Sequence, residues 1–304
     1  MKQNYLLPSL KHFLELNDDA RINHIEKDLW IGYPRAQQGL EKLHHLLLHP
    51  KRTRMPNLLI VSPTNNGKTM LIQKFFRDQF PDRAKNLVDE EDMLLESPIV
   101  SMQMPPNPDV KRFYLSLMQK IDFYKSYKNS TISSFEPRVY QFMKTHKVRM
   151  LIIDEIHNVL AGTYRQQLEF LNVLRYIGNE LKIPIVCVGT KEAYLAIRSD
   201  PQLENRFEPF ALPLWRSGSN FEALLESFVS VLPLKKYSNL NQTDISEYIL
   251  VKGEGIIGEI VTLIKRAAIL AIKTGQEYID KSLLESVDYH SPSERRQVFE
   301  REIV

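Results

Sequence analysis

A loop at residues 62–69 has the residue types and the spacing needed to bind phosphate groups. It differs at one position from the pattern Gly-x-x-x-x-Gly-Lys-Ser/Thr, because Ser62 stands where the first glycine is expected. In such loops the backbone N–H groups and the first turn of the following helix surround the phosphate oxygens. Gly67 would let the backbone approach closely, Lys68 would reach the β- and γ-phosphates, and Thr69 would give its hydroxyl to Mg²⁺. The loop therefore predicts a nucleoside triphosphate site with a magnesium ion.

Two adjacent carboxylates form a second candidate element of this site. Asp154 and Glu155 follow the apolar residues 150–153, so they stand at the end of an expected strand. Asp154 would help to hold the magnesium ion, and Glu155 would polarise the attacking water as general base. Acid pairs after strands are common, and this pair gains its significance from its position downstream of the phosphate loop. His157 could sense the nucleotide or a partner, or could make only a local hydrogen bond.

The elements that must position these residues follow from the hydrophobic pattern. Short apolar runs alternate with longer amphipathic stretches over the first two thirds of the chain. Four runs and a weaker fifth predict strands at residues 58–61, 98–102, 150–153, 185–188 and 210–214. Helical spacing predicts helices at residues 68–80, 108–121, 136–146 and 166–181. The alternation predicts an α/β architecture with a parallel sheet between helices.

The pattern becomes wholly helical after about residue 214. Helices are expected at residues 219–232, 243–251, 256–274 and 280–287. Ser219, Thr243 and Asp280 are plausible N-caps for three of them. The expected organisation is an N-terminal extension at 1–28, an α/β core at 29–214, a helical lid at 215–288 and a C-terminal tail at 289–304.

Composition excludes several classes of protein. The 304 residues carry 40 Lys and Arg against 37 Asp and Glu, so the net charge of +3 is too small for a histone-like polycation. A single cysteine, Cys187, excludes a disulfide framework and a cysteine-based zinc site. No apolar run reaches the length of about 18 residues needed to span a bilayer, and the first residues lack the pattern of a signal peptide. We therefore expect a cytoplasmic protein with no membrane partner.

The motifs and three further segments resemble the AAA+ ATPases of the TniB/TnsC type, which regulate DNA transposition. The segments are residues 30–36, 54–61 and 154–163, and the resemblance extends over about residues 28–275. The phosphate loop alone would not identify this family. The resemblance implies an AAA+ P-loop core, with a five-stranded parallel sheet between helices and a C-terminal helical lid. It also implies ATP and Mg²⁺ as cofactors.

The resemblance assigns roles to further residues. Residues 30–36 correspond to the segment that holds the adenine, so Ile31 and Tyr33 are expected to contact it. The contacts expected from the phosphate loop come from Asn65, Asn66, Gly67, Lys68, Thr69 and Met70. Thr190 corresponds to the sensor 1 residue, which contacts the γ-phosphate or the water. Arg206 corresponds to the arginine finger that reaches the ATP of a neighbouring subunit, with Arg198 as the competing candidate.

One position departs from the pattern of many AAA+ proteins. They carry a sensor 2 arginine early in a lid helix, often after Gly-x-x, whereas this chain has Glu259 at the corresponding place. Lys265 or Arg266, later in the same expected helix, could substitute. The departure suggests that ATP hydrolysis is slow or depends on assembly or on a partner.

Members of the family bind double-stranded DNA through its phosphate backbone, along the inside of a ring or helical filament. Loops that mix basic, hydroxyl and aromatic residues suit such contacts. The candidate residues are Lys111, Arg112, Lys125, Lys128 and Ser130. Ordinary solvated loop charge is the alternative interpretation. No helix-turn-helix or zinc-finger pattern is visible, so base-specific recognition is not expected.

The resemblance implies an ATP-dependent regulator of DNA transposition. It would oligomerise on double-stranded DNA as a hexamer, a heptamer or a helical filament, and would recruit or activate a transposase. A TniQ-type targeting protein is a further expected partner. One alternative is a helicase loader or initiator of the AAA+ class, although these usually carry a winged-helix domain that the short stretch after the expected lid does not provide. Another is a stand-alone NTPase that acts on a small substrate.

Overall fold

The computed structural model describes residues 5–80, 98–121 and 132–303. The chain divides into two compact units, and both are discontinuous in sequence. The α/β unit comprises residues 35–64 and 68–212. The helical unit comprises residues 1–34, 65–67 and 213–304. Three residues of the phosphate loop therefore group with the helical unit, while the rest of the loop groups with the α/β unit.

A five-stranded parallel sheet organises the α/β unit, which confirms the expected fold class. The strands are β1 (Asn57–Val61), β2 (Ile99–Gln103), β3 (Met150–Asp154), β4 (Ile185–Gly189) and β5 (Phe207–Ala211). Their order across the sheet is β2-β3-β4-β1-β5. Leu58 lies opposite Val186 of β4 on one side and Glu208 of β5 on the other. The three inner strands are almost fully buried, as their continuous apolar sequences predict.

The expected position of the fifth strand was wrong by about three residues. β5 begins at Phe207, whereas the apolar run suggested residues 210–214. Because β5 lies at the edge of the sheet, Glu208 and Pro209 can be exposed within it. An edge position also tolerates Pro209, which cannot donate a ladder hydrogen bond. These two residues interrupt the apolar pattern on which the prediction was based.

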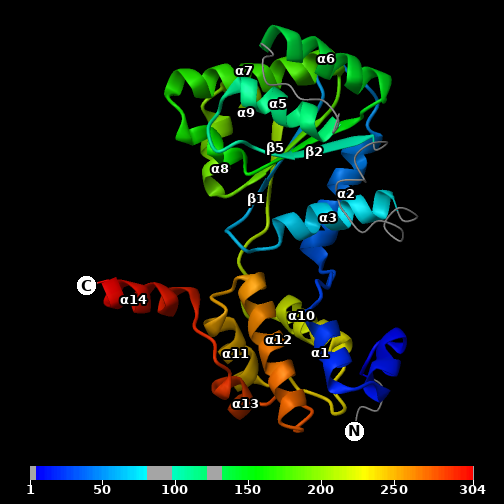
Figure 1. Ribbon diagram of the computed structural model, residues 1–304, viewed down its shortest axis with the longest axis vertical. Coiled ribbons are helices and arrows are strands. Elements are labelled where there is room, and N and C mark those ends of the chain that lie inside the picture. Colours follow the sequence, from blue (N-terminus) through cyan, green and yellow to red (C-terminus); the bar gives the residue numbers. More distant parts are fainter. Residues whose placement is uncertain (1–4, 81–97, 122–131, 304) are drawn as a thin grey trace. The chain divides into compact units, whose positions relative to one another are not determined.

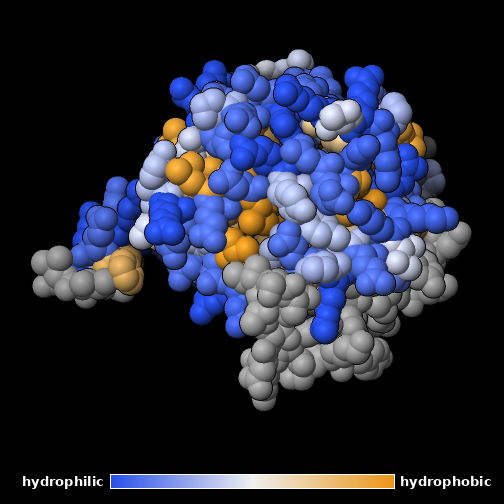
Figure 2. Space-filling view, turned by 90° about the horizontal axis from the view of Figure 1, so that it is seen from above, coloured by the Kyte–Doolittle hydropathy of each residue, from blue (hydrophilic) through white to orange (hydrophobic). Residues whose placement is uncertain are grey.

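Helices cover both faces of this sheet (Figure 1). The elements are α2 (Pro34–Leu48), α3 (Lys68–Gln79), α5 (Val110–Ile121), α6 (Ile132–Thr145), η3 (Ile156–Ala161), α7 (Tyr164–Leu181), α8 (Lys191–Arg198) and α9 (Pro201–Glu204). Figure 1 shows α5, α6 and α7 together on one face, with α2 and α3 on the other. One continuous hydrophobic core joins α5, α6 and α7 to β2, β3 and β4. On the side of α6 and α7, Figure 2 shows mostly hydrophilic side chains with scattered hydrophobic groups.

The helical unit has its own hydrophobic core. Its elements are η1 (Pro8–Glu15), α1 (Asp18–Glu26), α10 (Ser219–Val231), α11 (Thr243–Lys252), α12 (Ile257–Lys273), α13 (Lys281–Ser286) and α14 (Pro292–Ile303). The core runs along α10, α11 and α12, and Ile25 of α1 is completely buried in it. Asp280 is an N-cap as predicted, because its side chain accepts a hydrogen bond from the Leu283 N–H. Ser219 and Thr243 instead begin their helices one residue after the cap.

A buried ion pair fixes α1 in the helical unit. The Arg21 side chain is completely buried and donates both to the Glu277 carboxylate and to the Pro233 carbonyl. Glu277 also accepts a hydrogen bond from the Lys235 N–H at 3.1 Å. Burial alone would raise the pKa of Glu277, but the hydrogen bonds and the Arg21 charge hold it below its ordinary value. Every group in this cluster is therefore satisfied.

None of the helices within residues 5–80, 98–121 and 132–303 is long and apolar enough to cross a membrane.

Candidate functional site

The candidate catalytic residues of the α/β unit lie at one edge of its sheet. β4 lies between β1 and β3, so the three strands end side by side. The phosphate loop follows β1, Asp154 and Glu155 close β3, and Thr190 follows β4. The Ser62 N–H donates to the Gly189 carbonyl at 3.1 Å, which ties the start of the loop to the end of β4. In parallel α/β sheets this carboxyl edge is where ligands bind.

Lys68 is the first residue of α3 and is only 7% exposed. Its Nζ donates to the Ser62 and Pro63 carbonyls at 3.0 and 2.8 Å. Burial lowers the pKa of Lys68, while the negative charges of Glu155 and Asp154 act in the opposite direction. No carboxylate of the described residues lies within ion-pair distance of this ammonium group, so its direct partners are the two backbone carbonyls.

The conformation of the loop explains two of its residues. Gly67 has a φ of +86°, in the left-handed region that glycine adopts at least cost. Asn65, with a φ of 58°, is of a residue type that tolerates this region. Ser62 does not have a positive φ, so a side chain there causes no backbone strain. The departure from the glycine pattern at Ser62 is therefore compatible with the fold of the loop.

Within the helical unit, the side chains of Asn65 and Asn66 interact with the start of α12. The Asn66 Oδ1 accepts from the Ile257 N–H at 3.1 Å, and the Asn65 carbonyl accepts from the Gly258 N–H at 3.0 Å. These acceptors cap a helix that has no side-chain cap of its own. A Cβ on Gly258 would lie 2.1 Å from the Asn65 Oδ1, so a larger residue there would displace the Asn65 side chain. Sequence reasoning expected both asparagines to face the nucleotide and did not anticipate this capping role.

Asp154 and Glu155 have distinct environments. Burial raises the pKa of Asp154, and the adjacent Glu155 charge adds to this effect. A hydrogen bond from the Glu155 N–H and the positive charges of Lys68 and His157 oppose it. Glu155 adopts a left-handed conformation with a φ of 54°, which turns the chain sharply at the end of β3. A non-glycine residue in this region stores about 1 kcal/mol or more of strain, and such strain is common at functional sites.

His157 and Thr190 lie next to these carboxylates in the fold. The His157 Nε2 is 3.2 Å from the Glu155 Oε2, while its buried Nδ1 has no hydrogen-bond partner among the described residues. The Thr190 hydroxyl donates to the Glu192 carboxylate, and Thr190 is the N-cap residue of α8. The structure thus gives His157 a local partner in the candidate general base. Thr190 is at the strand end where a sensor residue is expected.

The residues expected to hold the magnesium ion provide the appropriate ligand types. Thr69 lies on the first turn of α3, and its hydroxyl has no hydrogen-bond partner among the described residues. Asp154 uses Oδ1 to accept from the Glu155 N–H, which leaves Oδ2 available. A hydroxyl and a carboxylate are oxygen ligands that suit Mg²⁺, which also keeps several waters and phosphate oxygens in its shell. The donor set therefore fits the ion.

The residues expected to hold the adenine, Ile31 and Tyr33, both lie in the helical unit. Met70, which was expected to contact the nucleotide from the phosphate loop, is half-buried on α3 of the α/β unit. In the helical unit, Ile31 packs against the core, and the Tyr33 ring makes an edge contact with Trp215 at a centroid distance of 5.0 Å. Gly67 of the phosphate loop lies close to Tyr33, because a Cβ atom on Gly67 would be 4.0 Å from the Tyr33 hydroxyl. Sequence reasoning missed Trp215, although an aromatic residue at the expected domain boundary was a visible signal.

Glu259 occupies the position where a sensor 2 arginine was considered. It is 8% exposed and accepts hydrogen bonds from Asn65, from Tyr289 and from Arg295 of α14. Burial would raise the pKa of Glu259, but these donors hold it below its ordinary value. Glu259 thus connects the phosphate loop to α14 within the helical unit.

The two proposed substitutes for a sensor 2 arginine have other partners. Lys265 donates to the carbonyls of Glu26 and Lys27, at the end of α1. Arg266 donates to the Asp288 carbonyl. Both side chains therefore serve the packing of the helical unit.

The structure distinguishes the two candidates for the arginine finger. Arg198 forms an ion pair with Glu204 at 3.2 Å and lies over the Tyr194 ring. Arg206 donates to the Asn179 Oδ1 at 2.7 Å, and no carboxylate of the described residues lies within ion-pair distance of it. Arg206 directly precedes β5, at the amino edge of the sheet. Arg206 thus has no ion-pair partner among the described residues, whereas Arg198 has one.

The expected DNA contacts are described only in part. Lys111 and Arg112 are exposed on the first turn of α5, which Asp109 caps through the Arg112 N–H. Lys125, Lys128 and Ser130 lie outside the described residues.

A comparison with protein families identifies one match. The model of a family described as "Bacterial TniB protein" matches residues 21–217, which is more than half of the chain. No curated protein sequence matches.

Solved structures share the fold at low sequence identity. The ORC2 protein of Aeropyrum pernix, in ADPNP–ADP complexes, has a TM-score of 0.58 at 14% identity, over 86% of this chain and 70% of that chain. The ORC1 protein of Aeropyrum pernix in complex with DNA also has a TM-score of 0.58 at 14% identity, over 91% of this chain and 69% of that one. Cdc6p from Pyrobaculum aerophilum has a TM-score of 0.59 at 15% identity, with coverages of 87% and 68%. At these identities the comparisons show an AAA+ fold and nothing more specific.

Proposed function

Because the chain belongs to the TniB family of bacterial transposition proteins and has the AAA+ ATPase fold, we propose that it is an ATP-dependent regulator that assembles on double-stranded DNA and recruits or activates a transposase. One observation carries the catalytic part of this proposal. The phosphate loop, the Asp154–Glu155 pair and Thr190 follow three adjacent strands at a single edge of the sheet. This arrangement is suited to phosphoryl transfer to water.

The residues act in stages. Lys68 exchanges its two carbonyl partners for phosphate oxygens, because a buried ammonium group gains most from a full negative charge. Thr69 and Asp154 would hold a magnesium ion, which would supply positive charge against the phosphate oxygens. Glu155 accepts a proton from the attacking water, and His157 fixes the direction of the Glu155 carboxylate. Thr190 contacts the γ-phosphate or this water.

A Glu155→Gln variant tests the role of the general base. Turnover of ATP should fall by about 10²–10⁴-fold, the usual contribution of a general base, while binding of a fluorescent ATP analogue is retained. Glu180→Gln, on the exposed surface, is the control and should leave turnover unchanged. Normal turnover in Glu155→Gln would exclude Glu155 as the base.

DNA binding is proposed through phosphate contacts. Lys111 and Arg112 are exposed and adjacent, which supports a sequence-independent contact. Lys111→Ala should weaken duplex binding equally for all sequences and should reduce its dependence on salt. An unchanged affinity would mean that the contact lies elsewhere. The partners proposed from the family are a transposase and a TniQ-type targeting protein.

The test of the whole proposal is assembly on DNA. The protein is mixed with duplex DNA and a non-hydrolysable ATP analogue, and oligomers are observed by electron microscopy and light scattering. Rings or filaments should form with the analogue and should be absent with Lys68→Ala, which removes the phosphate-binding ammonium. Monomers under the first condition would contradict the proposal.

A further inference from the structure

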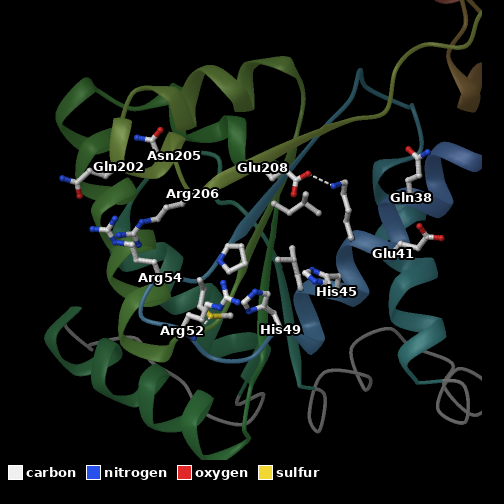
Figure 3. Close-up of a pocket in the computed structure, with 15 residues that line it drawn as sticks. Gln38, Glu41, His45, His49, Arg52, Arg54, Gln202, Asn205, Arg206 and Glu208 are labelled. Atoms are coloured by element: carbon white, nitrogen blue, oxygen red, sulfur yellow. Dashed lines mark hydrogen bonds and ion pairs between the residues drawn. The ribbon is translucent and has the colours of Figure 1, made fainter.

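A cavity of about 1080 Å³ opens at the amino edge of the sheet in the α/β unit. It lies beside the starts of β1 and β5, and Figure 3 shows the side chains that line it. Its lining includes the apolar residues Leu46, Met55 and Leu58 and two carboxylates, Glu41 and Glu208, but basic side chains outnumber the acidic ones at its rim. The cationic and imidazole side chains of the rim are Lys42, His45, His49, Arg52, Arg54 and Arg206.

The charge of this cavity is not balanced. One ion pair, between Lys42 and Glu208, neutralises a single cation at the rim. No carboxylate of the described residues lies within ion-pair distance of Arg52, Arg54 or Arg206. Burial lowers the pKa of Arg206, the nearby positive charges of Arg54 and Arg175 lower it further, and the negative charge of Asp200 acts in the opposite direction. Two arginines are therefore held close together against their mutual repulsion, which costs stability in the free protein.

The backbone fixes the spacing of these two arginines. The Asn57 N–H, at the start of β1, donates to the Arg206 carbonyl at 2.9 Å. In the sheet register Asn57 lies opposite Phe207, the residue after Arg206. Arg54 stands three residues before this hydrogen-bonded pair and is exposed. Figure 3 shows the Arg54 and Arg206 side chains on the same side of the cavity.

The cavity cannot serve the phosphates bound by the same copy of the chain. β1 separates Arg54 from the phosphate loop, and a five-residue strand is about 15 Å long. Among the described residues, the basic side chains that affect the pKa of Asp154 are Lys68 and His157, and neither is an arginine. At the amino edge, by contrast, Arg54 and Arg206 lie beside one cavity and have no carboxylate of the described residues within ion-pair distance. When the amino edge of one copy meets the carboxyl edge of the next, the contact is head-to-tail and repeats into a ring or a filament.

We propose that Arg54 is a second cation that acts with Arg206 on the triphosphate of the ATP held by the neighbouring copy of the chain. This inference rests on the proposed function and assigns to Arg54 a role that sequence reasoning did not. Two guanidinium groups can bind different phosphate oxygens at once, each with a bidentate fork. The excess charge at the amino edge then becomes an attraction to any copy that carries ATP. A copy without nucleotide offers no such charge, so assembly follows ATP loading.

Subunit mixing tests the proposal on the full chain with duplex DNA. Arg54→Ala should lower the turnover of ATP by about tenfold or more, and Arg206→Ala should lower it further. Arg54→Ala is then mixed with an equal amount of Glu155→Gln, which keeps both arginines and its ATP site but lacks the base. About half of the Arg54→Ala subunits would then face an intact arginine pair, and their turnover should rise accordingly. Arg149→Ala is the matched control, since Arg149 is exposed directly before β3 at the same edge.

Each other outcome would overturn the proposal. Normal turnover in Arg54→Ala, with a loss in Arg206→Ala, would exclude Arg54 and leave the proposed function intact. If the turnover of Arg54→Ala is reduced and does not rise on mixing with Glu155→Gln, Arg54 acts within its own subunit or on the stability of that subunit. Reduced DNA affinity with normal turnover in the bound protein would make the cavity a DNA site. The absence of ATP hydrolysis in the unaltered protein would refute the proposed ATPase function itself.

Discussion

The two units differ in whether their buried or clustered charged side chains have partners of opposite charge. In the helical unit, Arg21, Glu277 and Glu259 are buried, and each meets an opposite charge as well as neutral hydrogen-bond partners. In the α/β unit, Lys68 is buried and donates to two backbone carbonyls, and neither Arg54 nor Arg206 has a carboxylate of the described residues within ion-pair distance, although Glu41 and Glu208 line the same cavity. The first arrangement stabilises the fold, and the second is costly until a ligand arrives. The distribution of unpaired charge therefore separates the residues that build this protein from those proposed to act.

The largest effect is expected at the buried ion pair of the helical unit. Arg21→Ala would leave the Glu277 carboxylate buried without its partner, which costs about 3–5 kcal/mol. Urea unfolding followed by tryptophan fluorescence would measure this loss, since Trp215 lies in the helical unit. Lys144→Ala removes an exposed ion pair with Glu180 and should have a much smaller effect, because water screens such pairs. Equal losses of stability in Arg21→Ala and Lys144→Ala would contradict the proposed difference between the two units.

A smaller loss is expected at Glu259. Glu259→Ala removes the shared acceptor of Asn65, Tyr289 and Arg295, at a cost of about 1–3 kcal/mol. Because Asn65 belongs to the phosphate loop, ATP affinity should fall together with stability. Titration of a fluorescent nucleotide and thermal unfolding would measure the two effects. Glu259→Gln keeps the shape and one acceptor, so its losses should be smaller than those of Glu259→Ala.

The stability of the helical unit should decrease in acid because of His24. Burial lowers the pKa of His24, and the nearby charges of Lys27, His12 and Lys265 lower it further. Neutral His24 therefore contributes fully to the stability of the fold above the pKa of about 6.5 that it has in the unfolded chain. This contribution is lost as the pH falls through the lower pKa that His24 has in the folded protein. His24→Leu removes the titrating group, and the buried Nε2 has no hydrogen bond to lose. Thermal unfolding between pH 7 and pH 5 should therefore show a steeper decline for the unaltered protein than for the variant.

The smallest effect on stability is expected at Asp154, and its dependence on pH should be opposite in sign to that of His24. Burial raises the pKa of Asp154 in the folded protein. The protonated carboxyl group therefore contributes to stability below the pKa that Asp154 has in the unfolded chain, and this contribution is lost as the pH rises through the pKa in the folded protein. At pH 7 the ionised carboxylate is therefore a cost to the free protein. Asp154→Asn should raise the melting temperature by at most a few degrees while abolishing ATP turnover. Asp78→Asn, which removes an exposed ion pair with Lys74, should not raise it.

The sequence was informative where the signal is local. The phosphate loop and the acid pair are short contiguous motifs, and the apolar runs identified the inner strands because these are covered on both faces. The edge strand β5 was shifted because its exposed residues break the run. The tail, which lacks a core pattern, forms α14 and reaches Glu259 through Arg295.

The charge networks could not be predicted because their members are far apart in sequence. Arg21 and Glu277 are 256 positions apart, and Asn65 and Glu259 are 194 apart. Nothing in the pattern of residues 18–26 distinguishes a completely buried arginine from a solvated one. The role proposed for Arg54 was likewise not predicted from the sequence, since it depends on the pairing of β1 with β5.

The central position of β1 also has a consequence for synthesis on the ribosome. The Ile185 N–H donates a hydrogen bond to the Asn57 Oδ1, and the two residues are 128 positions apart in the sequence. Both strands that neighbour β1, namely β4 and β5, come from the end of the α/β unit. At about 5–20 residues per second, the ribosome needs roughly 6–25 s to deliver the first of these neighbours. During that time the apolar side chains of Leu58, Leu59 and Ile60 have no strand partner in the nascent chain. Among the five strands of the sheet, the strand that leads into the phosphate loop is therefore the one that a ribosome-associated chaperone should protect longest.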